Sequence, residues 1–245
     1  MCIIMIECYY DLHIHSCLSP CSDDDMTPSN IAGMSYLKGL NLIAVCDHNS
    51  CLNVGAVTKC ADEMGITVIP GMELETSEEV HCLCYFKSLE DALYFNEYVE
   101  KNMPKIELNR KIYGEQSIMN ENDEKTSAID YLLSTATNID IETAEKKVHQ
   151  MDGIFIPAHF DKASYSVSSN LGFLPPEVFV DGIEIFKNEN LEKVYKLNKS
   201  LKDIPVFYNS DAHNLALIKE KESNLLLIKN DIVSFFRKIK ALQTK

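Results

Sequence analysis

The sequence predicts an α/β protein built as a barrel of β/α units, and two features of the sequence support this fold class. Short runs rich in Ile, Val and Leu alternate with helix-forming segments along most of the 245 residues, as they do where parallel strands are covered by helices. Histidine and acidic side chains follow several of these runs, and the carboxyl ends of the strands of such barrels share one face. We therefore expect a polar site at the carboxyl ends of the strands.

The individual elements follow in order along the chain. Residues 3–10 form a short apolar run bounded by a polar loop, which is typical of a buried strand. Thr27 and Pro28 are expected to open the first helix as N-cap and first helical residue, and Gly39 to end it. Further strands are expected at residues 42–46, 67–70, 80–86, 154–158, 182–186, 206–209 and 225–228, and further helices at residues 54–64, 89–101, 141–150, 191–201 and 231–242.

The chain is expected to form a single domain over residues 1–245, because no linker or break in composition separates two apolar halves. Roughly seven strands with their helices fit one barrel. Residues 102–125 are polar and mixed in charge, so we expect an insertion or lid that begins there and extends over residues 102–150.

The composition restricts the partners and the compartment. The chain has 37 acidic and 23 basic residues and a formal net charge of −14. Because binding to a nucleic-acid backbone needs Lys and Arg, this charge predicts that nucleic acid is not the partner, although a small anion can still be bound by metal ions. We expect no membrane span and no signal peptide. Nine cysteines, an odd number, then predict reduced thiols in a cytoplasmic protein.

The first strand is followed by two histidines, His13 and His15, that can bind one metal ion together. Residues two apart on a strand point to the same face, but surface or core histidines produce this pattern equally often. The pattern gains weight because other candidate donors also lie at strand ends, namely Asp47, His48, Glu73, His81, His159, Asp211 and His213. Six of the seven histidines are placed in this way, and only His149 falls on a helix.

In the order and spacing of these motifs, the chain resembles the PHP (polymerase and histidinol phosphatase) domain family. The matching segments are DLHIHS at 11–16, CDHN at 46–49, PGMELE at 70–75, His81, PAHFD at 157–161 and SDAH at 210–213. They run through nearly the whole chain, and the ordered set is far more specific than any single motif. The resemblance implies a distorted (β/α)7 barrel that holds up to three metal ions and hydrolyses phosphate esters.

The resemblance also implies roles for individual residues. The implied metal ligands are His13, His15, His48, Glu73, His81, His159, Asp211 and His213, with Glu73 as the bridging carboxylate, although Glu75 could face the same side. The family usually supplies one more ligand, His or Asp, shortly after the paired histidines. Here that loop is longer, and Asp23 is our choice, with Cys21 and Asp24 as alternatives. We expect Asp47 to orient a ligand imidazole, with direct binding of a metal ion as the alternative.

The donor types predict the chemistry. Imidazole and carboxylate together suit Zn²⁺, Mn²⁺ or Fe without discriminating among them, whereas a thiolate site made of Cys17, Cys21, Cys46 and Cys51 matches no common spacing. Two metal ions roughly 3.5–4 Å apart can clamp both oxygens of a phosphoryl displacement and lower the pKa of water to about 7. We therefore predict two or three divalent metal ions, and hydrolysis of a small phosphomonoester or nucleotide-type substrate by a metal-activated hydroxide.

Lys162 is the predicted substrate-binding residue. It is the one cation in a hydroxyl-rich loop that follows His159, and such groups suit a phosphate, although an ordinary surface loop would look the same. Three alternative functions remain open. The first is an amidohydrolase-like enzyme, which needs a bridging lysine, and Lys87 is the nearest candidate for it. The second is a catalytically silent metal-binding regulatory module. The third is a nuclease, which the acidic charge disfavours.

Overall fold

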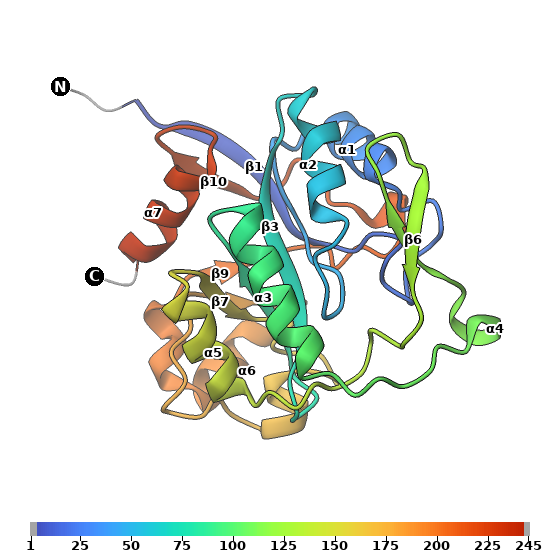
Figure 1. Cartoon of the computed structure of the whole chain (residues 1–245). Helices are drawn as coiled ribbons and strands as arrows, with labels where there is room; N and C mark the ends of the chain where they lie inside the picture. The colour runs from blue at the N-terminus through green and yellow to red at the C-terminus, as the bar shows by residue number, and fades with distance from the viewer. Residues whose placement is uncertain (1–3, 243–245) are drawn as a thin grey trace.

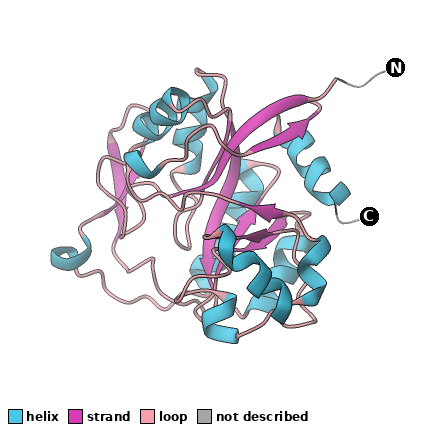
Figure 2. Ribbon diagram, turned by 180° about the vertical axis from the view of Figure 1, so that it is seen from behind, coloured by secondary structure: helices cyan, strands magenta, loops and turns pink. Residues whose placement is uncertain are grey.

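The computed structural model describes residues 4–242, which form an α/β fold around a six-stranded sheet (Figures 1 and 2). The sheet has the strand order β10-β1-β2-β3-β4-β7. Its strands are β1 (Ile6–Ile14), β2 (Leu42–Val45), β3 (Thr67–Glu75), β4 (His81–Tyr85), β7 (Ile154–Pro157) and β10 (Asn224–Leu227). Two separate pairs are β5 (Gln116–Met119) with β6 (Lys125–Ile129), and β8 (Ile183–Glu184) with β9 (Val206–Phe207). The first strand therefore extends to Ile14, beyond the predicted end, and Ile3 lies outside the described residues.

Helices lie around the strands in both views. They are α1 (Pro28–Leu37), α2 (Val54–Asp62), α3 (Leu89–Lys101), α4 (Arg110–Tyr113), α5 (Ile141–Gln150), α6 (Leu191–Leu197) and α7 (Ile232–Leu242), with shorter helices at Val167–Leu171, Asn188–Asn190, Lys199–Asp203 and Leu215–Leu217. Pro28 opens α1 as predicted, but Thr27 makes no capping hydrogen bond and donates instead to Asp123 Oδ2 at 2.9 Å. Helices α2 and α3 pack against β3, and α5 packs against β7.

The predicted parallel order of the strands is wrong at two positions. Strands β1, β2 and β3 are parallel, but β4 runs antiparallel to both β3 and β7, and β10 runs antiparallel to β1. The connection from β3 to β4 is a short turn, and a parallel pair needs a crossover of a dozen or more residues. As a consequence His81, at the start of β4, lies opposite Glu75 at the end of β3.

The predicted (β/α)7 barrel is confirmed only as an α/β fold with a curled sheet, because the described strands do not close a continuous seven-stranded barrel. Strands β8 and β9 form a parallel pair of their own. Two backbone hydrogen bonds connect the region of this pair to the region of β7. One runs from Asp181 N to Phe155 O at 2.9 Å, and the other from Phe160 N to Glu184 O at 2.8 Å. After β9 the chain returns to β1, where Ala212 forms an isolated parallel bridge with Ile14.

The core positions β3 closely against its neighbours. Gly71 has no room for a side chain, because a Cβ there would lie 2.7 Å from Cys46 Sγ and 3.2 Å from Val45 O. The Tyr85 hydroxyl donates a hydrogen bond to Leu12 O at 2.7 Å, which joins β4 to β1 through the interior. Each fully buried aliphatic or aromatic side chain of this core contributes about 1.5–3 kcal/mol. This packing fixes the position of Glu73, two residues beyond Gly71.

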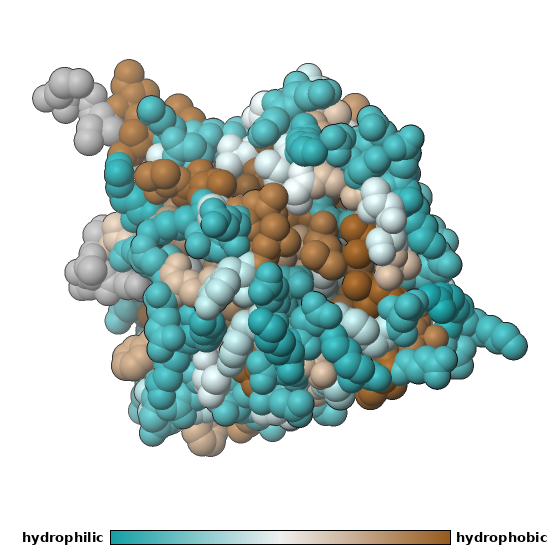
Figure 3. All heavy atoms as spheres, viewed as in Figure 1, coloured by the Kyte–Doolittle hydropathy of each residue, from teal (hydrophilic) through white to brown (hydrophobic). Residues whose placement is uncertain are grey.

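The predicted insertion is ordered. Residues 102–125 are not one loop, because they include α4 and β5, which pairs with β6 as a hairpin on the right of Figure 1. The hairpin is fixed to the first half of the chain, since Ser117 N donates to Cys17 O at 3.1 Å and Asn53 Nδ2 donates to Ser117 O at 3.0 Å. The surface of this view is largely hydrophilic, with apolar patches across its middle (Figure 3). None of the described helices is long and apolar enough to cross a membrane.

Candidate metal centre

The carboxylate of Glu73, at the end of β3, is fully buried and surrounded by imidazoles. Its Oε1 lies 3.3 Å from His13 Nε2, 3.0 Å from His81 Nδ1 and 3.2 Å from His159 Nε2, and its Oε2 lies 3.3 Å from His15 Nε2 and 3.0 Å from His48 Nδ1. Imidazoles of five histidines therefore surround the two oxygens. A buried carboxylate in this position can be shared by more than one metal ion.

Asp211 is a second carboxylate at this centre. Its Oδ1 lies 3.4 Å from His13 Nε2 and 3.2 Å from His15 Nε2. Among the described residues, three groups of side chains have donor atoms within 4.8 Å of one another and could each hold a metal ion: His13, His15, Glu73 and Asp211; His48, Glu73 and His81; and His15, Cys21, His48 and His213. His159 joins the centre through Glu73 Oε1. The structure thus brings all eight side chains implied by the family resemblance together.

The hydrogen bonds of His13 and His15 identify which of their nitrogens can bind a metal. His13 Nδ1 lies 3.1 Å from both oxygens of Glu184, and His15 Nδ1 lies 3.0 Å from Ser19 Oγ, whose own hydrogen goes to Asp47 at 2.7 Å. We infer that both Nδ1 atoms carry hydrogen and that both Nε2 atoms are bare. The two Nε2 atoms are 3.1 Å apart and face buried carboxylates, an arrangement that is costly without a cation between them.

Three buried polar atoms of the centre have no hydrogen-bond partner, namely His48 Nδ1, Glu73 Oε2 and His159 Nδ1. Buried polar groups are nearly always paired in native proteins. Glu73 Oε2 lies 3.0 Å from the unpaired His48 Nδ1, a pair that a bound metal ion would satisfy, and the mixed nitrogen and oxygen donors fit a divalent transition metal. The donor atoms of the centre therefore fit Zn²⁺, Mn²⁺ or Fe, the metals expected from the sequence.

The electrostatic field of the centre favours positive charge. Burial lowers the pKa of His13, but Glu184, Glu73 and Asp211 outweigh burial and raise it well above its usual value. Burial also lowers the pKa of His15, but Asp211 and Glu73 outweigh burial and raise this pKa to about 9. Burial raises the pKa of Glu73, yet the surrounding imidazoles hold it well below its usual range.

Two ligands of the centre stay neutral. Burial and the neighbouring His15 lower the pKa of His213 to about 3. Burial also lowers the pKa of His159. Neutral imidazoles have a free lone pair, which is the form that coordinates metals.

Buried carboxylates hold the ligand segments in position. Asp47 accepts hydrogen bonds from Ser16 N at 2.7 Å and from Ser19 Oγ at 2.7 Å, so it reaches His15 through Ser19 rather than directly. Asp11 accepts from Ser210 N and Lys219 N, both at 3.0 Å, which ties the segment carrying Asp211 to β1.

Two of the ligands have a strained backbone. The backbone φ angles are +27° at His159 and +53° at Asp211, and such conformations cost about 1–3 kcal/mol each for residues other than glycine. Strain of this kind collects at functional sites, so the backbone supports the assignment made from the side chains.

Glu184 was missed by the reasoning from sequence. It is buried in β8 and accepts hydrogen bonds from His159 N at 2.7 Å and Asn209 Nδ2 at 2.7 Å, in addition to its contact with His13. It therefore links three segments of the centre. A signal was available, because Glu184 is the one acidic residue inside the apolar run Gly182–Phe186.

The loop after His15 does not bring Asp23 to the centre. Asp23 and Asp24 are exposed and belong to none of the three groups, whereas Cys21, an alternative in the sequence analysis, belongs to the group of His15, His48 and His213. The reason lies in the path of the loop, because Asp23 N is bound to His213 O at 2.9 Å and its side chain is directed outward.

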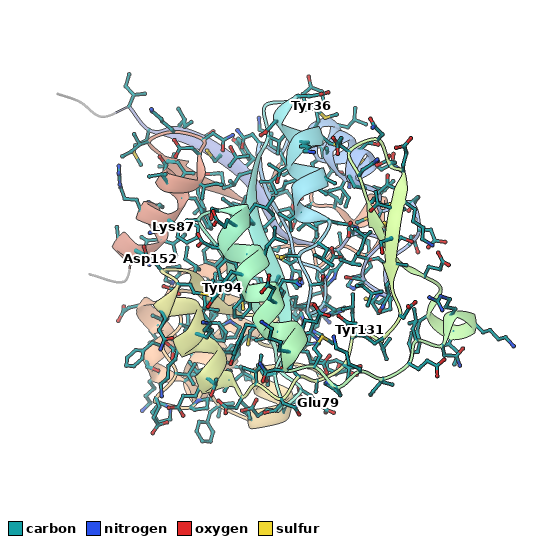
Figure 4. The ribbon with its side chains drawn as sticks, in the orientation of Figure 1. Tyr36, Glu79, Lys87, Tyr94, Tyr131 and Asp152 are labelled. Carbon is teal, nitrogen blue, oxygen red and sulfur yellow. The ribbon has the colours of Figure 1, made fainter. Side chains whose placement is uncertain are left out.

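The two lysines considered in the sequence analysis lie in different places. Lys162 forms an ion pair with Asp211 Oδ2, and its Nζ lies 4.8 Å from the centre of the Phe186 ring. Lys87 instead pairs with the exposed Asp152 (Figure 4), beyond the end of β4 that is opposite to His81. Lys87 is therefore not placed to bridge metals in the way that the amidohydrolase alternative requires.

The fold and the centre define a protein that can hold divalent metal ions among histidine and carboxylate side chains. A sequence model of the PHP domain family matches residues 11–161. This chain belongs to the PHP domain family, whose members and structural neighbours are metal-dependent hydrolases and phosphoesterases.

Three similar proteins illustrate this relationship. The 5'-3' exoribonuclease of Haemophilus influenzae is 36% identical over 70 residues, which are 29% of this chain and 24% of that protein. The lesion-specific endonuclease Q of Pyrococcus furiosus has a TM-score of 0.69 and 20% identity, over 96% of this chain and 56% of that chain. A putative metal-dependent phosphoesterase of Bifidobacterium adolescentis has a TM-score of 0.59 and 19% identity, over 95% of this chain and 96% of that chain. This chain thus spans about a quarter of the exoribonuclease and just over half of the endonuclease.

These relatives contradict the prediction that nucleic acid is not a partner. One is an exoribonuclease, and endonuclease Q has been crystallised with a 27-mer duplex that carries an abasic lesion at the active site. The prediction rested on the net charge, which sums over the whole surface. Exposed charges more than about 8 Å away are largely screened at physiological salt, so the charges close to the centre matter more than the sum.

Proposed function

We propose that this chain hydrolyses phosphodiester bonds of nucleic acid in a reaction that depends on two or three divalent metal ions. The observation that carries the proposal is the buried Glu73, which is surrounded by five imidazoles and belongs to two groups of possible metal ligands. His13, His15, Glu73 and Asp211 would hold one ion, and His48, Glu73 and His81 another. Paired ions supply a nucleophile near neutral pH and stabilise the attacking and leaving oxygens of the phosphoryl group.

The protein's own side chains orient the ligands and the substrate. Glu184 and Ser19 hold the hydrogens of His13 and His15 on Nδ1, which directs both Nε2 atoms into the centre. Lys162 sits at the edge of the centre, partly exposed beside Asp211. From this position its ammonium group can donate hydrogen bonds to a non-bridging phosphate oxygen.

Two exposed aromatic rings at the edge of the centre support a nucleotide substrate. Tyr165 is 47% exposed and stacks on His81 at 4.9 Å between ring centres, and Phe186 is 51% exposed next to Lys162. Aromatic faces beside a charged centre suit stacking with a base, worth about 1–3 kcal/mol per base. A base in a duplex must leave its stack to use them, so we expect single strands or damaged duplex to be preferred.

A lysine-rich segment, residues 187–202, provides local positive charge. It contains five lysines and two glutamates. Its five lysines are exposed, and none of them forms an ion pair within residues 4–242. They are Lys187, Lys193, Lys196, Lys199 and Lys202. Asp161 accepts hydrogen bonds from Phe186 N at 2.7 Å and Lys187 N at 3.0 Å, which ties the start of the segment to the loop of Lys162. Because the segment starts beside the loop of Lys162, its unpaired cations can contact a phosphate backbone.

A second candidate is hydrolysis of a small phosphomonoester or nucleotide. The observation that favours it is the size of the Bifidobacterium adolescentis phosphoesterase, of which this chain covers 96%. A molecule of that size needs no further domain to bind a small substrate.

One assay separates the two candidates. The purified chain, loaded with Mn²⁺ or Zn²⁺, is incubated with a single-stranded oligonucleotide, an intact duplex, a duplex with an abasic site, and a set of small phosphomonoesters, with a chelator-treated sample as control. The proposal predicts metal-dependent cleavage of the single strand or the damaged duplex. Hydrolysis restricted to the small monoesters would overturn it in favour of the second candidate.

The role of the lysine-rich segment is tested by charge reversal. Lys193→Glu with Lys196→Glu should raise the KM for the oligonucleotide and flatten its dependence on salt, because two phosphate contacts are lost. The matched control reverses Lys229 and Arg237, which are equally exposed but lie outside the segment. An equal effect of both pairs would show that only net charge matters.

A further inference from the structure

A pocket of about 270 Å³ lies between the short helix Val167–Leu171 and helix α6. Its volume is close to the roughly 300 Å³ at which pockets for small molecules begin. The motif PAHFD supplies His159 to the metal centre, and its last residue, Asp161, lines this pocket and is not among the possible metal ligands. The side chains of the lining used below are Asp161, Ser168, Asn190, Lys193, Val194 and Leu197.

Two side chains of the pocket present hydrogen-bond acceptors. The Asp161 carboxylate accepts from Phe186 N at 2.7 Å, from Lys187 N at 3.0 Å and from Asn190 Nδ2 at 2.7 Å. A carboxylate can accept about four hydrogen bonds, so Asp161 can accept one more. Because Asn190 gives its Nδ2 to Asp161, its Oδ1 is a second acceptor, and no donor within residues 4–242 reaches it. The pocket therefore suits a ligand that donates hydrogen bonds.

A further part of the lining is apolar. Val194 and Leu197 lie three residues apart on α6, so their side chains share one face of this helix. Val194 is buried and Leu197 is exposed. An apolar surface together with hydrogen-bond acceptors suits a flat ring with amino groups at its edge, which is the chemistry of a nucleobase. A phosphate group suits the pocket less well, because Asp161 is itself an anion.

The pocket is connected to the metal centre by the chain and by hydrogen bonds. Asp161 follows His159 by two residues, which places their Cα atoms within about 7 Å of each other. The next residue, Lys162, forms the ion pair with the centre described above. Ser166 Oγ donates a hydrogen bond to Lys162 O at 2.7 Å, which fixes the helix Val167–Leu171 to the same loop. This short distance lets the base and the phosphate of one nucleotide occupy the pocket and the centre together.

We propose that this pocket is a base-recognition site that prefers adenine, cytosine and guanine, which carry amino groups, to uracil and thymine, which do not. The inference rests on the proposed function in taking a nucleotide as the substrate. An amino group can donate to Asp161 or to Asn190 Oδ1, whereas O4 of uracil or thymine is an acceptor and would face these acceptors unpaired. A hydrogen bond to a charged carboxylate corresponds to about 10-fold or more in affinity.

Binding of nucleosides tests the pocket without an activity assay. The metal-loaded, full-length chain is titrated with adenosine, cytidine and uridine, and the dissociation constants are measured by ligand-observed NMR. These nucleosides have no phosphate group, so they report on the base and cannot be hydrolysed as phosphate esters. We expect adenosine and cytidine to bind about 10-fold more tightly than uridine. Asp161→Asn should remove this preference, because the amide is neutral and one of its two polar atoms is a donor.

Ser168→Leu tests the pocket by filling it. The Ser168 hydroxyl makes no hydrogen bond within residues 4–242, so the larger side chain should block the base without removing a contact of Asp161. We expect adenosine and cytidine to bind at least about 10-fold more weakly, with unchanged metal content. Ser127→Leu is the matched control, because Ser127 lies on β6, outside the pocket, and its side chain also makes no hydrogen bond in the described range. It should bind nucleosides as the wild type does.

Absence of nucleoside binding, equal affinity for the three nucleosides, or unchanged binding in Ser168→Leu would overturn the inference. Ser168→Leu also decides the result if Asp161→Asn does not fold. A chain that shows the preference but cleaves no oligonucleotide would contradict the proposed function and leave the pocket in place. A chain that cleaves oligonucleotides but binds the three nucleosides equally would do the reverse.

Discussion

Within residues 4–242, two clusters combine histidine with buried carboxylate side chains, and only one of them has the geometry of a metal centre. The first is the centre around Glu73. The second joins His149 on α5 to Glu145 on the same helix and to Asp181 before β8, with His149 Nε2 at 2.7 Å from Asp181 Oδ2. Glu145 and Asp181 are both buried. The residue types are the same, so residue type alone does not make a metal site.

The difference lies in where the hydrogens are. Both nitrogens of His149 face a carboxylate, so a protonated ring satisfies both acids, and Asp181 also accepts a hydrogen bond from Phe155 N at 2.7 Å. Around Glu73, several imidazoles direct bare nitrogens at one carboxylate. A single proton meets the need of the His149 cluster, and a metal ion meets the need of the centre around Glu73. None of the possible metal groups in residues 4–242 includes His149.

The largest expected effect is that of Glu73→Gln compared with His149→Gln. Removal of the shared carboxylate charge leaves neighbouring cations uncompensated, so at least one metal ion should dissociate and kcat should fall by roughly 10²–10³, the range for a single electrostatic group. His149→Gln should keep full metal content and activity. Elemental analysis with a kinetic assay checks both, and equal metal loss in the two variants would remove the distinction between the clusters.

The sequence was sufficient for much of the centre and insufficient for the rest, for physical reasons. His13 and His15 could be placed because their spacing on a strand fixes a common face, and the ordered motifs brought the other ligands with them. The direction of β4 depends on a short turn, so His81 reaches the centre from the start of a strand rather than from its carboxyl end. Glu184 stands out in the sequence as the one acidic residue of an apolar run, but its role depends on three segments that are distant in sequence.

The loop after His15 shows the same limit. Spacing could not decide between Asp23 and Cys21, because the outcome depends on hydrogen bonds to Asp47 and to the backbone of His213.

Chelation should affect only the first cluster. A metal ion at 100 times its Kd stabilises the native state by about 2.7 kcal/mol, which corresponds to a shift in Tm of roughly 5–11 °C for a chain of this size. Calorimetry with and without a chelator measures the shift. His149→Gln should show the same shift as the wild type, and Glu73→Gln a smaller one. A chelator effect that His149→Gln abolishes would place a metal in the second cluster.

Lys162→Ala should have a moderate effect on substrate use. Loss of a charged hydrogen bond to phosphate should cost about 1–3 kcal/mol of transition-state stabilisation, which lowers kcat/KM by roughly 5- to 150-fold. The metal content should not change, because Lys162 contacts Asp211 Oδ2 while Oδ1 faces His13 and His15. Lys87→Ala is the control, since this lysine is also paired to an aspartate but lies away from the centre. Unchanged kinetics in Lys162→Ala would exclude the predicted role.

The smallest effect concerns the pH dependence of the second cluster. Burial lowers the pKa of His149, but Asp181 and Glu145 outweigh burial and raise it above its usual value of 6.5. A group whose pKa is raised by folding stabilises the protein fully below its unfolded pKa, and this contribution is lost as the pH rises through the folded pKa. His149→Gln should therefore lower Tm by a few degrees at about pH 5.5, the scale of one hydrogen-bonded group. The difference from wild type should shrink toward about pH 8.5, measured at constant metal saturation. A difference that stays constant over this range would mean that His149 acts by packing and not as the proton carrier that distinguishes this cluster from the metal centre.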